Sequence, residues 1–322
     1  MSGTPHDPPR VAVVVVTYNS ADVLGGCLDS IPDGAAGVRL AAVVVADNAS
    51  RDASVQIAEA AAGLPVRVVR MGRNAGYAAA VNAGVAALDL DELDAVFVTN
   101  PDCRLRPGAL ARLAAALRPP VGIAVPKLVN PDGSLQPSLR RMPTVGRAFA
   151  EAVIGGNLAG RIAGLGELVT DPREYERPGQ AVWATGAALL VATTVIRDIG
   201  GWDESFLLYS EETEYALRAA DHGWTLWYEP AAVVEHIGGS SSNLTPDLEG
   251  FKSYHFMRST LYVMAKHGVK FNLRKKLYTS YLNWLIAACF NSTQGRAKYS
   301  GYIRAILEAS SVAPVRGRIF SL

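Results

Sequence analysis

Short apolar runs and stretches of helical periodicity alternate along the first hundred residues. The apolar runs, at 11–16, 41–46, 66–69 and 95–99, are rich in Val and show no polar alternation, which is typical of strands buried on both faces. The helical stretches between them lie at 21–31, 54–62 and 76–87. Parallel strands need a long crossover, usually a helix. The order therefore predicts an α/β fold, with a mostly parallel sheet of right-handed crossovers flanked by helices. Asp52 or Ser54 is expected to cap the second helix.

The pattern changes in the second half of the chain. Residues 140–180 are rich in Gly, Arg and Pro with one helix-like piece at 144–163, and we expect a surface excursion that orders over a ligand. Apolar runs return at 182–192 and 225–234, and helical periodicity returns at 251–268 and 277–290. We therefore expect a disordered N-terminus over 1–10, an α/β domain over 11–250 and a basic helical region over 251–322.

Charge separates the last of these regions from the rest of the chain. The 322 residues are 49% hydrophobic and 19% charged, as in a globular protein, and the net charge is only +1. However, residues 252–322 carry 12 basic residues and one acid, Glu308, whereas the remaining residues carry 19 basic and 29 acidic. The balances of +11 and −10 indicate different partners for the two regions.

The apolar run 277–290 follows Arg274, Lys275 and Lys276 and is too short to span a bilayer. Two interpretations stay open: the region binds an anionic membrane surface, or it covers the α/β domain or forms a homodimer interface. Nucleic acid is not expected as a partner, because no recognised binding motif accompanies the charge.

The first residues and the cysteines predict a cytoplasmic protein. Residues 1–10 are polar and proline-rich, and the run that follows is too short to span a membrane. Cys27, Cys103 and Cys289 fit no disulfide or zinc spacing. A membrane-binding tail would place the protein peripherally at the inner face of the cell membrane.

Polar side chains follow all four of the first apolar runs. They are, in chain order, Thr17, Tyr18 and Asn19; Asp47 and Asn48; Arg73 and Asn74; Asn100 and Asp102. The carboxyl ends of parallel strands meet along one crevice, where open α/β sheets bind ligands. A dinucleotide fingerprint is excluded, because the first strand is followed by TYNSADVLGG, in which Gly25 and Gly26 come too late. A P-loop ending in GK(S/T) is also missing.

The stretches VTYNS, ADNAS and NPD resemble the family-two GT-A inverting glycosyltransferases over residues 10–240, especially the rhamnosyltransferase and galactofuranosyltransferase branches. The resemblance implies a GT-A fold with a C-terminal helical extension, and transfer of a sugar from a nucleotide diphosphate to an acceptor hydroxyl. It implies that the nucleotide is bound by Thr17, Tyr18, Asn19, Asp47, Asn48, Arg73, Asn74 and Asn100. Asp47 takes the position that accepts the N3 proton of uracil or thymine, which implies a UDP or dTDP donor.

The same resemblance implies a metal site. Asn100-Pro101-Asp102 stands where most of these enzymes carry Asp-x-Asp, which leaves Asp102 as the firm carboxylate ligand. His236 matches a metal-binding histidine of the family and precedes a Gly-Gly turn. A divalent cation, Mg²⁺ or Mn²⁺, fits this ligand set, since such ions also take substrate phosphates and water.

The resemblance further implies the catalytic base and the acceptor site. The family reads Glu-Asp or Asp-Asp where this chain reads Glu211-Glu212, and the second acid is its general base, so Glu212 is the first choice and Glu211 the second. Read alone, these acids are an ordinary helix start. Trp183, Trp202 and Tyr209 are expected to stack on the acceptor, although aromatic residues at such spacing are commonly core.

The expected activity is metal-dependent, inverting transfer of L-rhamnose from dTDP-rhamnose to an acceptor hydroxyl of a cell-wall, lipid-linked or polysaccharide glycan. A transferase using a UDP-hexose or UDP-galactofuranose is the alternative within the family. A catalytically silent sugar-nucleotide-binding protein is the alternative outside it. A nucleotidyltransferase is disfavoured, because no Gly-rich basic loop follows the first strand.

Overall fold

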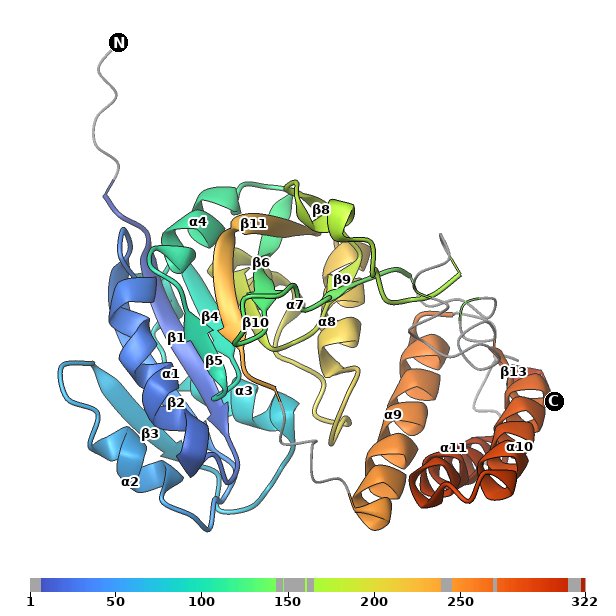
Figure 1. Cartoon of the computed structure of the whole chain (residues 1–322). Coiled ribbons are helices and arrows are strands. Elements are labelled where there is room, and N and C mark those ends of the chain that lie inside the picture. The colour runs from blue at the N-terminus through green and yellow to red at the C-terminus, as the bar shows by residue number, and fades with distance from the viewer. Residues whose placement is uncertain are drawn as a thin grey trace. The chain divides into compact units, whose positions relative to one another are not determined.

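The computed structural model describes residues 7–142, 147, 160, 165–238, 245–268, 271–311 and 320–321 (Figure 1). The first six residues and most of the helix expected at 144–163 lie outside the described residues. The chain divides into two compact units. The first comprises Met1–Leu139, Pro172–Glu204 and Tyr215–Gly238; the second comprises Arg140–Asp171, Ser205–Glu214 and Gly239–Leu322. The division expected at residue 250 stays a prediction.

The first unit contains the α/β sheet. Its helices include α1 (Ala21–Gly34), α2 (Ser54–Glu59), α3 (Tyr77–Ala86), α4 (Ala109–Ala116), α7 (Thr193–Ile199) and most of α8 (Glu211–Asp221). Its strands include β1 (Arg10–Thr17), β2 (Arg39–Asp47), β3 (Val66–Arg70), β4 (Ala95–Thr99), β5 (Cys103–Leu105), β6 (Val121–Val129), β8 (Gly179–Ala181), β9 (Trp183–Ala184), β10 (Ala188–Ala192) and β11 (Thr225–His236). The four strands and three helices expected within the first hundred residues are confirmed.

All of these strands except β9 form one sheet in the order β3-β2-β1-β4-β10-β6-β11-β5, with β8 also paired to β11. Strands β1 to β4 are parallel. Strand β10 runs antiparallel between β4 and β6, and β6 is parallel to β11. Consequently β11 points in the same direction as β1 to β4, and its carboxyl end lies on the edge of the sheet where theirs lie. The mostly parallel sheet flanked by helices is confirmed.

The core is continuous because the central strands are apolar on both faces. Residues Val11 to Val15 of β1 are fully buried, as expected for a strand with helices on either side of the sheet. Helix α3 packs against β1 at Gly84. A Cβ at Gly84 would lie 2.5 Å from Val14 Cγ1, so only glycine allows the helix to lie this close.

The apolar run 182–192 contains two separate strands, β9 and β10. Thr185 between them donates its backbone N–H to Ser138 O at 2.9 Å. The N-cap position of α2 is Ala53, so neither Asp52 nor Ser54 occupies it as expected. Asp52, one residue before the N-cap, accepts from Ser54 N, the first N–H of α2, at 3.0 Å and from Ala21 N, the first N–H of α1, at 2.9 Å.

Among its described residues, the second unit includes the helices α9 (Pro246–Lys266), α10 (Leu273–Cys289) and α11 (Thr293–Ser311), the start of α8, and the short strands β12 (Phe271–Asn272) and β13 (Phe320–Ser321). Thr245 Oγ1 accepts from Leu248 N at 3.3 Å and caps α9, and Pro246 occupies the first turn, where its missing N–H costs nothing. Buried side chains of α9 and α11 form a separate core of Met257, Leu261, Met264, Ala305 and Ile306. Within the described part of the chain, no helix is both long and apolar enough to span a bilayer.

The close approach of α3 to β1 predicts opposite effects of alanine at two helical glycines. Gly84→Ala adds helix propensity but forces its Cβ into Val14, and we expect a net loss on the order of 1 kcal/mol in the free energy of unfolding. Gly25→Ala is the matched control in α1, since its Cβ would meet nothing closer than 3.8 Å, and we expect a gain of about 0.5–1 kcal/mol. Denaturant unfolding measures both. Stabilisation by both substitutions would contradict the steric argument.

Candidate active site

The register between β5 and β11 brings two distant side chains together. The antiparallel pairing places His236 opposite Cys103 and Val234 opposite Leu105. Asp102 directly precedes β5, and its carbonyl oxygen accepts from Ile237 N at 3.0 Å. Asp102 and His236, 134 residues apart in the chain, therefore lie side by side at the end of β11.

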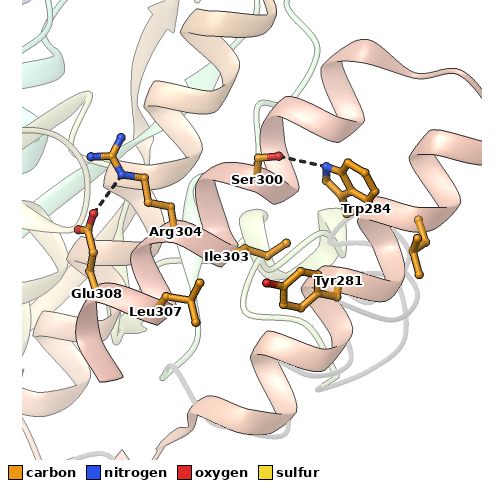
Figure 2. A pocket seen from close by; sticks show the side chains of 8 residues that line it. Tyr281, Trp284, Ser300, Ile303, Arg304, Leu307 and Glu308 are labelled. Atoms are coloured by element: carbon orange, nitrogen blue, oxygen red, sulfur yellow. Dashed lines mark hydrogen bonds and ion pairs between the residues drawn. The ribbon is translucent and has the colours of Figure 1, made fainter. Parts of the chain in front are cut away.

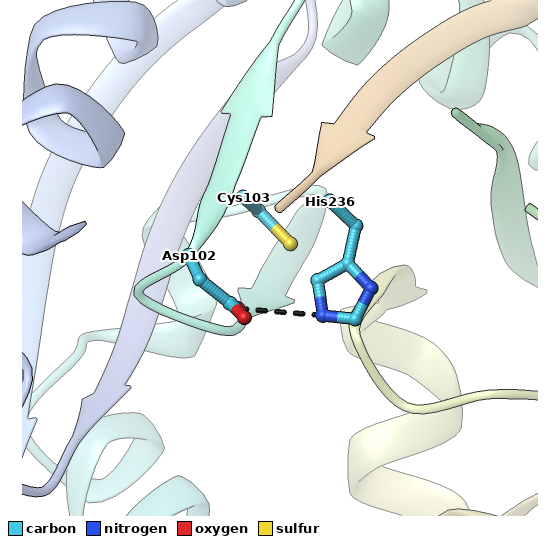
Figure 3. A group of neighbouring side chains, drawn as sticks. All are labelled: Asp102, Cys103 and His236. Carbon is cyan, nitrogen blue, oxygen red and sulfur yellow. Dashed lines mark ion pairs between the residues drawn. The ribbon is translucent and has the colours of Figure 1, made fainter. Parts of the chain in front are cut away.

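Figure 3 shows the two side chains pointing toward each other, with Asp102 Oδ1 3.4 Å from His236 Nε2. The other ring nitrogen, Nδ1, lies 2.6 Å from Gln136 Oε1. Gln136 Nε2 donates to Asn130 Oδ1 at 3.2 Å, so the oxygen of the Gln136 amide faces the histidine. His236 Nδ1 is therefore the donor, and in the neutral ring the lone pair of Nε2 faces Asp102.

Asp102 Oδ1 is buried, and in the described structure His236 Nε2, at 3.4 Å, is the group positioned to donate to it. Burial acts to raise the pKa of Asp102, but the hydrogen bond and positive charge of His236 outweigh it and hold the pKa below its usual value. The carboxylate is thus ionised at neutral pH. A carboxylate oxygen and an imidazole lone pair are both acceptors, so a proton or a cation must lie between them.

Cys103 lies close enough to complete a group of three, with all ligand atoms within 4.8 Å of one another. Burial raises the pKa of the Cys103 thiol well above its ordinary value, and Sγ donates to Ala187 O at 3.3 Å. A protonated thiol is a poor ligand for a hard cation, which prefers oxygen. Of the three groups, Asp102 and His236 are therefore the ones that could hold a divalent cation.

The ends of β1 and β2 form a second polar centre. Thr17 and Asp47 are paired in the register of these strands, and Thr17 Oγ1 donates to Asp47 Oδ1 at 3.0 Å. Ser50 N donates to Asp47 Oδ2, also at 3.0 Å. Each carboxylate oxygen keeps a further lone pair, so Asp47 is held in place and is still able to accept from a ligand.

The neighbouring loops are tied to one another by side-chain amides. Asn48 Nδ2 donates to Gly76 O at 3.1 Å, and its Oδ1 accepts from Ala75 N at 3.3 Å. Asn48 thus fixes the loop on which Arg73 and Asn74 are exposed. Asn19, at φ +50°, accepts from Arg51 N at 2.8 Å, and Tyr18 beside it is exposed. Asn100, half-buried, donates its backbone N–H to Ala187 O.

Two of the three aromatic residues expected at the acceptor, Trp183 and Trp202, are packed in the first unit's interior. Trp202 stacks on Tyr215 with ring centroids 4.9 Å apart, and Tyr77 meets it edge-on at 5.9 Å. Two hydrogen bonds with the Asn82 side chain fix the backbone of Trp202. Asn82 Nδ2 donates to Trp202 O at 2.9 Å, and Trp202 N donates to Asn82 Oδ1 at 2.8 Å. Trp183 is also buried. Their contact with an acceptor stays a prediction.

The acidic residues lie at the start of α8, in the part of the chain that belongs to the second unit. Tyr209 and Ser210, just before α8, have φ of +69° and +68°, which non-glycine residues adopt rarely. Glu214 is fully buried and pairs with Lys266 Nζ of α9 at 2.8 Å. A buried carboxylate needs such a partner, so α9 fixes the first turn of α8.

Further contacts come from the same face of α9. Ser259 Oγ donates to Leu208 O at 3.1 Å. Tyr262 meets Phe206 edge-on at 5.1 Å, and Phe256 meets Tyr209 edge-on at 6.0 Å. These α9 residues recur every three or four positions, as one helix face requires. The segment that carries the acids is therefore held by α9.

Glu211 and Glu212 differ in environment. Glu211 is buried and its Oε2 has no hydrogen-bond partner in the described structure. Burial, and then the charge of Glu212, raise the pKa of Glu211 to about 8. Glu212 is half-buried. At neutral pH the Glu211 carboxyl is thus mostly protonated.

Two contributors have no signal in the sequence. Gln136 lies 100 residues before His236, and Ser259 on the contacting face of α9 lies 51 residues after Leu208. Neither follows a strand end or matches a motif, so only the folded structure reveals them.

The chain matches known proteins over most of its length. The family model described as glycosyl transferase family 2 matches residues 12–164. An N-acetylglucosaminyl-diphospho-decaprenol L-rhamnosyltransferase of Mycobacterium tuberculosis is 34% identical over 245 residues, which cover 73% of this chain and 78% of the relative. The low-salt glycan biosynthesis hexosyltransferase Agl10 of Haloferax volcanii is 24% identical over 213 residues, covering 65% of this chain and 61% of the relative.

Solved structures share the fold at low sequence identity. GalNAc-T7 with UDP, GalNAc and Mn²⁺ aligns with a TM-score of 0.58 and 14% identity, covering 95% of this chain and 56% of that chain. The mannosyltransferase PcManGT of Pyrobaculum calidifontis, with GDP-Man and Mn²⁺, aligns with a TM-score of 0.52 and 18% identity, covering 96% and 78%. These likenesses concern the fold alone, and they confirm the expected GT-A fold.

The identity to the mycobacterial enzyme, the family match and the fold agree with one another. The chain belongs to glycosyl transferase family 2 and is a glycosyltransferase.

Proposed function

We propose that this glycosyltransferase uses a divalent cation and inversion of configuration to move L-rhamnose from dTDP-rhamnose to a hydroxyl of a lipid-linked or other cell-wall glycan. The observation that carries the cation-dependent mechanism is the pair of acceptors, Asp102 Oδ1 and His236 Nε2, that face each other at 3.4 Å. The 34% identity to an L-rhamnosyltransferase supports the sugar and the lipid-linked acceptor.

The residues present fit a cation. Asp102 Oδ1 is buried and faces His236 Nε2 at 3.4 Å, and Gln136 fixes His236 through its other nitrogen, an arrangement common around metal-bound histidines. Both atoms would be able to hold one divalent cation, which prefers oxygen ligands and also accepts imidazole nitrogen. GalNAc-T7 and PcManGT are both described with Mn²⁺. Mg²⁺ and Mn²⁺ both suit this ligand pair.

When bound, the cation neutralises negative charge that develops on the departing nucleoside diphosphate. Asp102 and His236 hold it. Arg73 and Asn74 are exposed on the loop that Asn48 fixes, and Arg73 supplies positive charge near the diphosphate. The chain's own contribution is thus orientation and charge at the leaving group.

Asp47 supports a thymine or uracil donor. Thr17 and Ser50 fix its carboxylate, and the remaining lone pairs accept the N3 proton that both bases carry and cytosine lacks. The relative's activity favours dTDP-rhamnose over UDP-galactofuranose or another UDP-hexose, which form the second candidate. Tyr18, Asn19 and Asn100 complete the proposed nucleotide site, and Trp183, Trp202 and Tyr209 remain the proposed acceptor contacts.

Glu212 is the proposed general base. It takes the proton from the acceptor hydroxyl as the oxygen attacks the anomeric carbon on the face opposite the diphosphate. Glu211 is the weaker candidate, because its raised pKa of about 8 leaves it protonated at neutral pH.

The proposed location is the inner face of the cell membrane, where the enzyme would meet a lipid-linked acceptor. Formation of a homodimer is the second proposed role of the basic region.

The proposed cation site predicts loss of turnover when either ligand is removed. Asp102→Asn and His236→Gln are each expected to lower dTDP release from dTDP-rhamnose by at least a hundredfold, because the leaving group loses its counter-charge. Chelation should do the same to the unmodified chain, and added Mn²⁺ should restore it. Asp132→Asn, at an exposed turn, is the matched control and should retain activity. Unchanged turnover in chelator would contradict the mechanism.

The proposed base predicts different effects of two adjacent substitutions. Glu212→Gln should lower the turnover number by about 10²–10⁴ without weakening donor binding, because the acceptor proton loses its base. Glu211→Gln should cost less than tenfold, since Gln resembles the protonated acid. Steady-state kinetics and donor binding by calorimetry measure both. The reverse order of effects would assign the base to Glu211, and donor binding without turnover on any acceptor would support the silent binding protein.

The buried Glu211 also predicts how stability depends on pH. Its folded-state pKa is about 8, above the ordinary carboxyl value of 4.5, so the folded state binds more protons between these pH values. The free energy of unfolding must therefore fall as pH rises from about 4.5 to about 8, by a few kcal/mol, and level off above that. Glu211→Gln should flatten this dependence in denaturant unfolding. Glu176→Gln, at an exposed position, should leave it in place.

A further inference from the structure

Helix α10 presents a continuous apolar face to solvent. Its exposed side chains recur every three or four residues: Tyr278, Tyr281, Leu282, Leu285, Ile286 and, just after the helix, Phe290. Tyr278 is 71% exposed and Phe290 is 82% exposed. Cys289 lies on the same side and is also exposed. We call these residues the α10 face. An exposed apolar patch of this size marks a surface that binds a protein partner, a ligand or a membrane.

The remaining sides of α10 are engaged within the second unit. Thr279, Ser280 and Ala287 are buried, and a Cβ at Gly295 of α11 would lie 2.8 Å from Ala287 Cβ. Trp284 Nε1 donates to Ser300 Oγ of α11 at 3.1 Å. The apolar character of the α10 face is therefore not required by the packing of α10 against α11.

A cavity of about 510 Å³ adjoins the α10 face (Figure 2). Tyr281 and Leu285 belong to both, and Trp284, Ile303 and Leu307 complete most of its apolar lining. The polar groups at the cavity are internally paired, since Arg304 Nε lies 3.0 Å from Glu308 Oε1. Such a recess suits a hydrocarbon chain better than a charged ligand.

The charge near the α10 face indicates an anionic partner. Arg274, Lys275 and Lys276 lie in the first turn of α10, and α10 has no acidic residue. The one acid of residues 252–322, Glu308, is engaged by Arg304 and by the hydroxyl of Tyr254. An apolar helix face beside basic residues is typical of helices that lie in the surface of an anionic bilayer.

The same charges disfavour a second copy of the chain as the partner. A symmetric dimer sets the same patch against itself, so two regions of balance +11 would meet with no free acid to pair their basic residues. Because no described helix is long and apolar enough to cross a bilayer, α10 would lie within its surface.

We propose that the α10 face inserts into the headgroup and upper acyl region of an anionic lipid bilayer, with the basic run 274–276 on the phosphates and a hydrocarbon chain in the adjoining cavity. This names the surface by which the enzyme reaches a lipid-linked acceptor, and in that respect it rests on the proposed function. Its test uses no donor and no acceptor, so either proposal can fail alone.

Cys289 provides the probe. Cys27 and Cys103 are fully buried, and burial raises the pKa of the Cys27 thiol to about 12, so an environment-sensitive fluorophore on a maleimide reacts selectively at Cys289. On the labelled full chain, vesicles of phosphatidylcholine with phosphatidylglycerol should shift emission to the blue, and high salt should reverse the shift. Pure phosphatidylcholine vesicles should give a much weaker response. No shift, or an equal and salt-independent shift with both lipids, would overturn the proposal.

Two sets of variants separate the apolar and charged contributions. Leu282→Gln/Leu285→Gln/Ile286→Gln should weaken partitioning more than tenfold. Arg274→Gln/Lys275→Gln/Lys276→Gln should weaken it about fivefold per residue, on the order of a hundredfold in total. Leu165→Gln/Val182→Gln removes exposed apolar side chains elsewhere and should change nothing. If the first variant fails to fold, the labelled unmodified chain decides alone.

Light scattering without lipid tests whether the α10 face binds a second copy of the chain. A monomer before and after the Leu282/Leu285/Ile286 substitutions supports the bilayer. A dimer that these substitutions dissociate, together with vesicle binding that they leave unchanged, would assign the α10 face to the chain itself and overturn the proposal.

Discussion

The antiparallel register between β5 and β11 is the constraint on which the candidate cation site depends. It sets His236 opposite Cys103, and so places Asp102, in the turn from β4 to β5, within reach of the imidazole. Because side chains alternate across a strand, a slip of one residue would turn His236 to the other face of the sheet. Apolar burial enforces the register, since Val234 and Leu105 are paired and both lie in the core. Hydrophobic packing thus positions the polar side chains of Asp102 and His236.

The acids at the start of α8 depend on a different part of the chain. Tyr209 and Ser210 hold backbone conformations that cost free energy and persist only when their surroundings determine them. Helix α9 provides these surroundings. Its Lys266 ammonium pairs with the fully buried Glu214 carboxylate. Removing Lys266 would take this cation from the fully buried Glu214 carboxylate and so destabilise the segment. The C-terminal helices are therefore part of what orients the proposed base, and the grouping of Ser205–Glu214 with them in one compact unit has this physical origin.

The sequence predicted the elements whose formation depends on local pattern. Strands β1 to β4 are uninterrupted apolar runs, and the helices between them follow from periodicity and chain length. Strand β10 was not recognised as antiparallel, because pairing between segments 90 residues apart leaves no local trace. The pattern indicated Asp52 or Ser54 as the cap of α2, whereas the N-cap is Ala53 and Asp52 bonds the first N–H of both α1 and α2. Asp102 and His236 were named through a family resemblance, whereas Gln136, which orients His236, lies in no motif. The sequence therefore predicts elements that depend on local pattern, but it does not predict contacts between residues far apart in the chain.

Asp102 and His236 face each other as two acceptors, and this explains why the pair suits positive charge. Gln136 Oε1 faces Nδ1 of the imidazole, so in the neutral ring the lone pair of Nε2 lies 3.4 Å from Asp102 Oδ1. Burial acts to raise the pKa of Asp102, but the hydrogen bond and charge of His236 hold this pKa below its usual value, so the carboxylate is ionised. Two buried acceptors with nothing between them are costly. The proposed cation would supply the positive charge that this pair needs.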